Sequence, residues 1–332
     1  MPDWWIYHGN GRVLDPDERD HRWPAPPPWR EFHGGPDLPT PESDVVEAER
    51  RLGRSFPTSY QDREVLNRIN AAITLARPLL VTGKPGSGKS SLAYSIAREL
   101  GLGRVLRWPI TSRTTLKAGL YDYDVFGRAQ AIGMRENSEI GNFVHLGPLG
   151  TALLPHRRPR VLLIDEMDKS DIDLPNDLLN IFEDGEFPVP ELIRVRDRES
   201  RVTVHTADPG AVAPVEAGVV RCHAFPIVVV TSNGERDFPP AFLRRCLSLA
   251  IPDPGVERLA EMVAAHFSDD GGEVTAELVR LFADRRAKLG GMAADQLLNA
   301  VHLVRSGAGD GVEAANWSEL LDAVWHRLSV GS

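Results

Sequence analysis

The stretch from residue 79 to residue 92 constrains this chain more than any other, because it reads L-L-V-T-G-K-P-G-S-G-K-S-S-L. Gly83, Gly88, Lys89 and Ser90 have the spacing G-x-x-x-x-G-K-[ST] of a phosphate-binding loop. The apolar run before the loop predicts a strand, and the apolar pattern after it predicts a helix. Strand, glycine loop and helix together predict an α/β fold with a nucleotide phosphate site.

Each residue type in this loop has a physical reason to be there. Glycines allow backbone conformations in which successive N–H groups point at phosphate oxygens. The ammonium of Lys89 adds charge at the β- and γ-phosphates, and the Ser90 hydroxyl is placed to ligate Mg²⁺. The start of the following helix offers its own unpaired N–H groups to the anion. We therefore expect the whole loop to bind the phosphates of a nucleotide through Gly83, Lys84, Pro85, Gly86, Ser87, Gly88, Lys89, Ser90 and Ser91.

A second apolar run ends in two carboxylates. Val161 to Ile164 is continuously apolar and is followed by Asp165 and Glu166. Such a run predicts a strand buried on both faces of a parallel sheet, and ligands bind at the carboxyl ends of such strands. We predict that Asp165 holds Mg²⁺, directly or through water, and that Glu166 polarises the attacking water.

Two later segments add polar side chains to this picture. A predicted strand at 225–230 is followed by Asn233, which is placed to contact the γ-phosphate or the water beside it. After a turn, the sequence P-P-A-F-L-R-R-C brings Arg244 and Arg245 to the end of a predicted helix. The simpler interpretations are a helix cap or turn former for Asn233 and a solvated basic pair for the arginines.

The amino-terminal 57 residues differ in composition from the rest. They hold ten of the 26 prolines and four of the seven tryptophans, so we expect extended structure without regular helix. The tryptophans predict an arm that packs on the body of the protein or on a neighbouring subunit, with a partner-docking motif as the alternative. These residues are Trp4, Trp5, Trp23 and Trp29.

The remaining chain divides into two predicted domains. Residues 58–252 are the nucleotide-binding α/β domain, with a helix predicted at 61–76. Within that domain, about 113–150 follows no single period and is interpreted as an insert, and about 184–224 predicts short strands or a hairpin. Residues 253–332 contain four segments with apolar residues at helical spacing, which predict a small helical domain.

Composition limits the function classes. The formal net charge of −9 argues against direct nucleic acid binding, which needs a basic surface. The two cysteines, Cys222 and Cys246, support neither a disulfide framework nor a zinc site, so we expect a cytoplasmic protein. We also expect no export signal and no membrane span, because no run approaches eighteen apolar residues.

These segments, in this order, resemble AAA+ ATPases, and most closely the MoxR-like branch with its dynein-related relatives. The resemblance covers about 60–305. It implies an α/β sandwich with a helical lid, assembled as a ring that is typically hexameric, with ATP and Mg²⁺ as cofactors. It also implies that 113–150 is the helix-2 insert of that branch and 184–224 its pre-sensor hairpin. The motifs that carry it are G-K-P-G-S-G-K-S, G-P-L before V-L-L-I-D-E, D-L-L-N-I-F-E-D-G-E-F, V-V-V-T-S-N and P-P-A-F-L-R-R-C.

The resemblance assigns further roles. It makes Asn233 sensor 1 and Arg245 the arginine finger that acts on a neighbouring subunit, with Arg244 as the second choice. One departure concerns the lid segment K-L-G-G-M-A-A-D-Q-L-L, which has no Arg or Lys at the turn where the family often has a sensor 2 arginine. Lys288 lies just upstream and is a possible substitute.

The functional prediction is an ATP-hydrolysing ring that remodels or activates a partner protein in a chaperone-like manner. The family resemblance implies a von Willebrand factor A domain protein as that partner. One alternative is a nucleotide-gated switch or motor component of a nucleic-acid-linked or defence system. Another is a small-molecule kinase that shares the glycine loop. A kinase would place acceptor-binding residues where this chain has Asn233 and Arg245, and it would need no ring.

Overall fold

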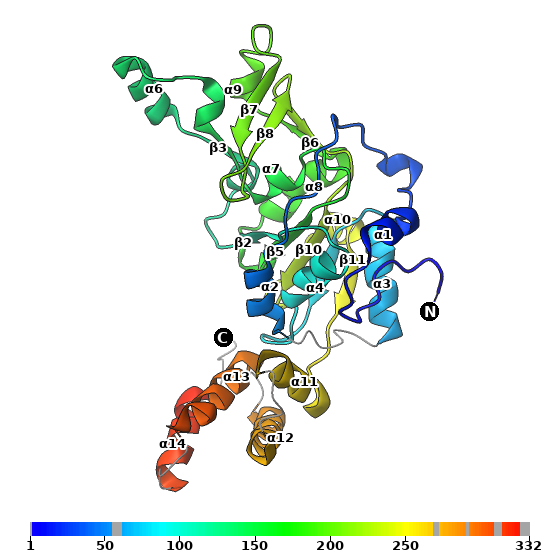
Figure 1. Cartoon of the computed structure of the whole chain (residues 1–332), viewed down its shortest axis with the longest axis vertical. Coiled ribbons are helices and arrows are strands. Elements are labelled where there is room, and N and C mark those ends of the chain that lie inside the picture. Colours follow the sequence, from blue (N-terminus) through cyan, green and yellow to red (C-terminus); the bar gives the residue numbers. More distant parts are fainter. Residues whose placement is uncertain (1, 55–61, 268–271, 290–291, 309–313, 326–332) are drawn as a thin grey trace.

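A five-stranded parallel sheet forms the centre of the computed structural model, which describes residues 2–54, 62–267, 272–289, 292–308 and 314–325 (Figure 1). The strand order is β11-β1-β10-β5-β2, so chain neighbours are separated by crossovers. The predicted strand before the glycine loop and the predicted strands at 161–164 and 225–230 are all confirmed. The strands are β1 (Leu79–Thr82), β2 (Leu106–Pro109), β5 (Val161–Asp165), β10 (Ile227–Ser232) and β11 (Leu247–Ala250).

Helices cover both faces of this sheet, because alternate residues of each central strand enter opposite cores. Leu80, Ile164 and Val230 belong to one buried cluster, whereas Val81 and Leu163 belong to the other. The interpretation of these strands as buried on both faces is therefore confirmed. One face carries α3 (Arg63–Thr74) and α4 (Ser91–Glu99); the other carries α7 (Pro148–Ala152), α8 (Leu174–Asp184) and α10 (Pro240–Arg245).

The predicted helix at 61–76 is observed as α3. The Asp62 side chain accepts the Glu64 N–H and caps its start, and Ile69 is fully buried against the sheet. Gln61 and the predicted boundary between residues 57 and 58 lie outside the described residues.

The insert and the hairpin region form one second sheet. Its order is β3-β4-β7-β8-β9-β6, and the two regions meet where His145 of β4 pairs with His205 of β7, their rings stacked 4.6 Å apart. The sequence predicted the two regions separately and missed this pairing, which joins strands that are far apart in the chain. The strands are β3 (Tyr121–Tyr123), β4 (Val144–Leu146), β6 (Glu186–Pro188), β7 (Arg201–His205), β8 (Val212–Glu216) and β9 (Val219–Arg221).

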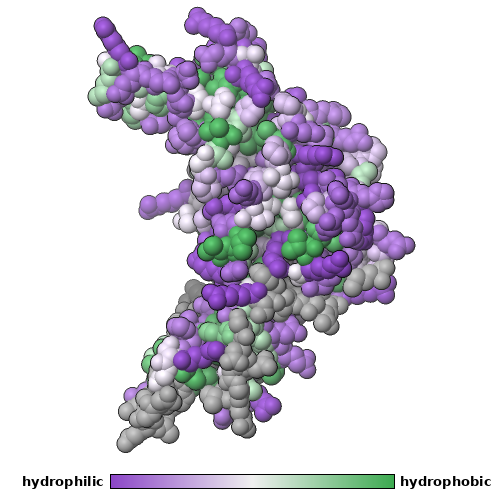
Figure 2. Space-filling view, viewed as in Figure 1, coloured by the Kyte–Doolittle hydropathy of each residue, from purple (hydrophilic) through white to green (hydrophobic). Residues whose placement is uncertain are grey.

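Short helices lie beside this second sheet, and one further short turn, η3, follows β5 of the central sheet. Helix α6 projects from the body of the molecule, and its Phe126 is 89% exposed (Figure 1). Figure 2 shows hydrophobic side chains among hydrophilic ones over the same projection. The helices are α5 (Leu116–Leu120), α6 (Val125–Met134), the 3₁₀ turns η2 (Ile140–Phe143) and η3 (Met167–Lys169), and α9 (Pro190–Ile193).

The expectation that residues 1–57 contain no regular helix is wrong. Helix α1 (Pro16–Arg22) begins with its proline in the first turn, where a missing N–H costs nothing, and Asp15 caps it. Helix α2 (Val45–Leu52) lies in a proline-free stretch and is capped by Asp44. The turn η1 (Pro28–Arg30) lies between them. The proline content of residues 1–57 as a whole therefore did not show that short helices form within this segment.

The predicted arm does pack on the body, though not through all four tryptophans. Trp5 is buried and its indole N–H donates to Asn67 at 3.0 Å, and Trp23 packs on the same core beneath the Arg158 guanidinium. Trp4 and Trp29 are instead exposed, Trp29 by 73%. For these two, the prediction of packing on the protein's own body is wrong.

Arg30 is the most deeply buried charge of this arm, with 6% of its surface exposed. Its guanidinium donates to the carbonyls of Phe182 and Ala76, at 2.7 and 2.9 Å, and lies 4.3 Å from the centroid of the Phe225 ring. Burial lowers its pKa, although nearby Glu183 opposes that shift. The arm is thus held to α8 and to the turn after α3 by a desolvated cation.

Replacing this cation should destabilise the fold. Arg30→Met keeps the stem but leaves buried carbonyls without donors, so we expect the free energy of unfolding to fall by about 3 kcal/mol. Urea unfolding followed by tryptophan fluorescence measures the change. Arg196→Met, which removes an exposed guanidinium, should change it by less than about 0.5 kcal/mol. Equal stability of the two variants would contradict an anchoring role.

The chain after the sheet is helical, in line with the sequence prediction. The predicted end of this domain, at residue 332, and Gly290 and Gly291 of the segment K-L-G-G-M-A-A-D-Q-L-L lie outside the described residues. Within the described ranges, no helix is both long and apolar enough to cross a bilayer. The helices are α11 (Val256–Phe267), α12 (Gly272–Leu289), α13 (Ala294–Leu303) and α14 (Ala314–Val324), with a π turn η4 (Val304–Ala308).

Candidate nucleotide-binding site

The glycine loop connects the carboxyl end of β1 to the start of α4, as predicted. Gly83, Gly86 and Gly88 all have positive φ angles, which other residues adopt at a cost. At Gly86 there is a second reason for glycine, because an added Cβ would lie 2.5 Å from the Cα of Ala293 at the start of α13. The loop is therefore confined between the sheet and the carboxyl-terminal helices.

Lys89 lies inside this loop and is only 7% exposed. Its Nζ donates to the carbonyl oxygens of Gly83 at 2.7 Å and Lys84 at 2.8 Å. Burial lowers its pKa, and the charges of Asp168 and Asp165 act in the opposite direction. The ammonium is thus held at the loop by carbonyl dipoles, where an incoming phosphate would find a partly desolvated cation.

Asp165 is the most heavily bonded carboxylate of the site. Its Oδ1 accepts hydrogen bonds from Ser90 at 2.7 Å and Thr231 at 2.9 Å, and its Oδ2 accepts from Arg107 at 2.9 Å. Burial opposes its charge, but these three donors hold the pKa below its ordinary value. The sequence did not single out Thr231 or Arg107, because nothing local links them to this carboxylate.

The donor set at Asp165 fits Mg²⁺. The Ser90 hydroxyl and an ionised carboxylate meet at one point, and Mg²⁺ typically takes one or two carboxylates plus phosphate oxygens and waters. Among the described residues there is no cluster of three or more His, Cys, Asp or Glu side chains that could hold a metal alone. A site that is completed by phosphate oxygens needs no such cluster.

Glu166 adopts a left-handed backbone conformation, with φ 63° and ψ 50°, directly after β5. This conformation is uncommon for a residue with a side chain and recurs at functional sites. The Glu166 N–H donates to Thr231, and the half-exposed carboxylate pairs with Lys169 at 3.0 Å. Lys169 is a further residue that the sequence analysis missed; its i+3 spacing from Glu166 was the available signal.

Asn233 lies just beyond the carboxyl end of β10, which pairs with both β1 and β5. Its backbone N–H donates to the buried Asp168 at 2.9 Å, and the Glu235 N–H donates to the same oxygen at 3.2 Å. Asp168 therefore fixes the turn that carries Asn233. The structure thus places Asn233, the glycine loop, Asp165 and Glu166 at one edge of the sheet.

Arg244 and Arg245 lie at the opposite edge. Strand β11 pairs in parallel with β1, with Leu247 beside Leu79. Both arginines come just before β11 and therefore lie at the amino end of β1. The loop follows the carboxyl end of β1, about 13 Å away. Arg245 pairs with Glu183 at 3.4 Å, and Arg244 is exposed. The structure therefore does not bring these arginines to the subunit's own loop.

The carboxyl-terminal helices reach the loop through an ion-pair chain. Asp253 contacts Lys84 of the loop at 2.7 Å and Arg286 of α12 at 3.2 Å. The start of α13, where the sequence lacks a basic residue, is occupied by Ala293 and Ala294, and Lys288 is exposed. Arg286 of α12 is thus a buried arginine next to the loop's ion-pair chain, and the sequence analysis did not propose it.

Comparisons with solved structures give distant similarities. The RuvB Holliday junction branch migration motor of Thermotoga maritima is 13% identical, with a TM-score of 0.38 over 86% of this chain and 72% of that chain. NtrX of Brucella abortus in complex with ATP is 15% identical, with a TM-score of 0.41 over 82% of this chain and 58% of that chain. A sequence comparison with curated proteins gives no match.

A comparison with protein-family models gives one assignment. The AAA domain (dynein-related subfamily) matches residues 78–246, which is more than half of the chain. The matched segment begins just before β1 and ends just after Arg245, so it contains the glycine loop, Asp165, Glu166 and Asn233. The chain therefore belongs to the dynein-related subfamily of AAA domain proteins.

Proposed function

We propose that this protein is a MoxR-like AAA+ ATPase that hydrolyses ATP within an oligomeric ring, typically hexameric, to remodel or activate a partner protein. The observation that carries the proposal is the contact between Ser90 and Asp165, with Glu166 as the next residue. It joins the phosphate loop to the acidic end of β5. AAA+ proteins typically oligomerise, which supports the ring.

In this proposal, each part of ATP binding and hydrolysis is assigned to particular residues. The loop from Gly83 to Ser91 holds the phosphates, and Lys89 neutralises their charge. Mg²⁺, when held by Ser90 and Asp165, supplies further neutralisation of the developing phosphate charge. Glu166 accepts the proton of the attacking water, and the Asn233 side chain orients that water or the γ-phosphate. A carboxylate positioned as a base favours hydrolysis over a switch that only binds nucleotide.

Arg245 is proposed to act on the ATP of a neighbouring subunit. Its distance from its own loop, at the opposite edge of the sheet, supports a role across an interface. The second candidate for this role is Arg244, which is exposed on the same helix. In this arrangement, an isolated subunit turns over slowly and assembly switches hydrolysis on.

The partner is proposed to be a protein, such as a von Willebrand factor A domain protein. The projecting α6, with Phe126 exposed, offers an apolar contact surface away from the nucleotide site (Figure 1). The net charge of −9 supports a protein rather than a nucleic acid as the direct partner. We propose that the protein acts in the cytoplasm.

Lys89→Ala tests the nucleotide site itself. Removing a buried ammonium that would contact phosphate should weaken ATP binding by about a hundredfold or more. Titration with a fluorescent ATP analogue measures the dissociation constant. Lys117→Ala removes an exposed lysine of α5 and should leave the dissociation constant within about twofold of that of the unchanged protein. An unchanged dissociation constant in Lys89→Ala would refute this assignment of the loop.

A further inference from the structure

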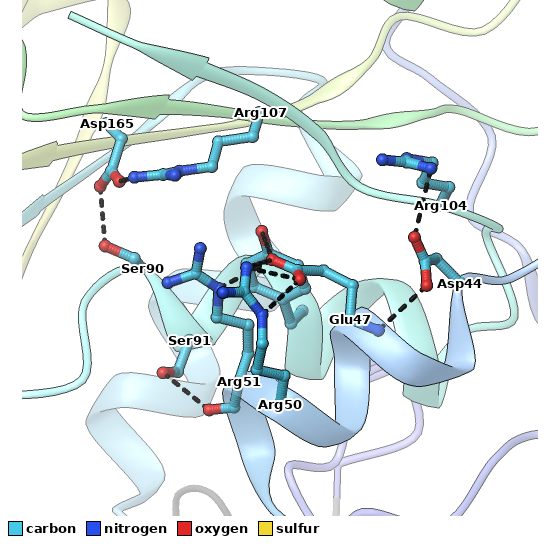
Figure 3. Close-up of polar contacts among 10 residues, drawn as sticks. Asp44, Glu47, Arg50, Arg51, Ser90, Ser91, Arg104, Arg107 and Asp165 are labelled. Carbon is cyan, nitrogen blue, oxygen red and sulfur yellow. Dashed lines mark hydrogen bonds and ion pairs between the residues drawn. The ribbon is translucent and has the colours of Figure 1, made fainter. Parts of the chain in front are cut away.

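A cavity of about 340 Å³ lies between α2 of the amino-terminal segment, α4 and the β2 edge of the central sheet. Its lining includes no residue of the phosphate loop from Gly83 to Ser91. It does include Arg107, whose guanidinium also contacts Asp165 (Figure 3). The cavity is therefore a neighbour of the nucleotide site and not a part of it.

Arginines dominate this lining. Five arginines line the cavity together with two acidic residues, Asp44 and Glu47. Arg107 also pairs with the carboxylate of Asp165, so five positive charges meet three negative ones, an excess of two. The whole chain carries a net charge of −9, so the sign of the charge at this cavity is opposite to that of the protein as a whole. The five are Arg50, Arg51, Arg98, Arg104 and Arg107.

The two carboxylates pair with three of these arginines and hold them in place (Figure 3). Glu47 accepts from Arg50 at 2.7 Å and from Arg51 at 2.9 Å, and Asp44 pairs with Arg104 at 3.2 Å. Burial opposes the charge of Glu47, but the hydrogen bonds from Arg51 and Arg50 lower its pKa. Each guanidinium carries five N–H donors, of which a shared carboxylate accepts only some.

The arginines come from separate elements, so their approach is a property of the fold. Arg50 and Arg51 belong to α2, Arg98 to α4 and Arg107 to β2, while Arg104 precedes β2. Like charges gathered in a cavity repel one another, and the carboxylates present offset only part of this positive charge. Planar guanidinium forks suit the oxygens of phosphate, which accept paired hydrogen bonds.

We propose that this cavity is a second anion site, which binds an oligophosphate of two or three linked phosphates. Each phosphate brings a charge of roughly −1.5, so two linked phosphates are enough to balance an excess of two positive charges. A volume of about 340 Å³ is that of a small-molecule site rather than a macromolecular groove. The oligophosphate is free pyrophosphate or the tail of a nucleotide.

Isothermal titration with pyrophosphate, in Mg²⁺-free buffer and with the full chain, tests the proposal. The unchanged protein should show two binding events, one at the phosphate loop and one at the cavity. Lys89→Ala should keep the cavity event. The double variant Arg50→Ala/Arg104→Ala should weaken that event at least about tenfold. The matched control Arg113→Ala/Arg196→Ala removes two exposed arginines outside the cavity and should leave it unchanged.

Two results would overturn the proposal. If Lys89→Ala abolishes all pyrophosphate binding, the phosphate loop is the only oligophosphate site. If a glutamate-rich peptide binds in an Arg50- and Arg104-dependent manner and pyrophosphate does not, the cavity receives acidic protein segments instead. A parallel titration with ADP compares the affinity of the cavity for the tail of a nucleotide with its affinity for free pyrophosphate. The comparison separates the two sources of the ligand. Failure of the ATPase proposal would appear separately, as unchanged ATP binding in Lys89→Ala.

Discussion

Arg245→Ala should lower ATP turnover by about a thousandfold or more at protein concentrations where the ring is assembled. The reason is that a guanidinium supplied from a neighbour stabilises charge only in the transition state. Because the residue lies at the sheet edge opposite its own loop, the affinity of the variant for ATP should stay nearly unchanged. Steady-state phosphate release gives the turnover, and titration with a fluorescent ATP analogue gives the affinity.

Arg244→Ala is the matched control, because it removes a guanidinium from the adjacent position of the same helix. Its turnover should remain within about threefold of the unchanged protein if Arg245 is the finger. Sedimentation of both variants confirms that they still assemble. Full activity of Arg245→Ala together with loss of activity in Arg244→Ala would exchange the two roles. Full activity of both would rule out a finger at this helix.

Glu166→Gln should slow hydrolysis strongly while preserving ATP binding. The amide has the shape of the carboxylate but cannot take the proton of the attacking water, which costs about 10² to 10⁴ in rate. The Asp165 network does not depend on the Glu166 side chain, so the loop should remain assembled. Single-turnover hydrolysis of ATP, measured beside equilibrium binding, separates the two effects.

Glu235→Gln supplies the control for this substitution. Glu235 is exposed on the turn after β10, and its contact with Asp168 uses the backbone N–H, which the substitution keeps. Its turnover should be unchanged. A Glu166→Gln variant that hydrolyses ATP at the ordinary rate would show that another group activates the water. Lys169 would then be the first residue to test, because it pairs with Glu166.

Local sequence pattern was enough to predict the centre of this molecule. The apolar runs that became β1, β5 and β10 are continuous, each ends in a loop or polar residue, and neither sheet face is open to water. Parallel strands place such ends at one edge, so Asp165, Glu166 and Asn233 could be assigned to one site from sequence. The sequence pattern could not identify the residues that form hydrogen bonds with them.

The residues that the sequence analysis missed form hydrogen bonds with residues far away in the chain. Thr231 and Arg107 both donate to Asp165, but they reach it from neighbouring strands far away in the chain. Arg30 bonds to carbonyls of α8 that lie more than 150 residues later. In the second sheet, β4 and β7 meet through a single residue pair. The prediction for residues 1–57 relied on the average composition of that segment. An average does not reveal a helix of eight residues, so the helix from Val45 to Leu52 was missed.

Complementation between two inactive variants is the most direct test of the account. An Arg245→Ala subunit keeps a complete phosphate loop and Glu166, and a Glu166→Gln subunit keeps the guanidinium that its neighbour needs. Each variant alone should be nearly inactive, and an equimolar mixture should regain turnover at those interfaces where the intact halves meet. That recovery would establish an active site built from two subunits. A mixture no more active than its components would contradict the proposed ring ATPase.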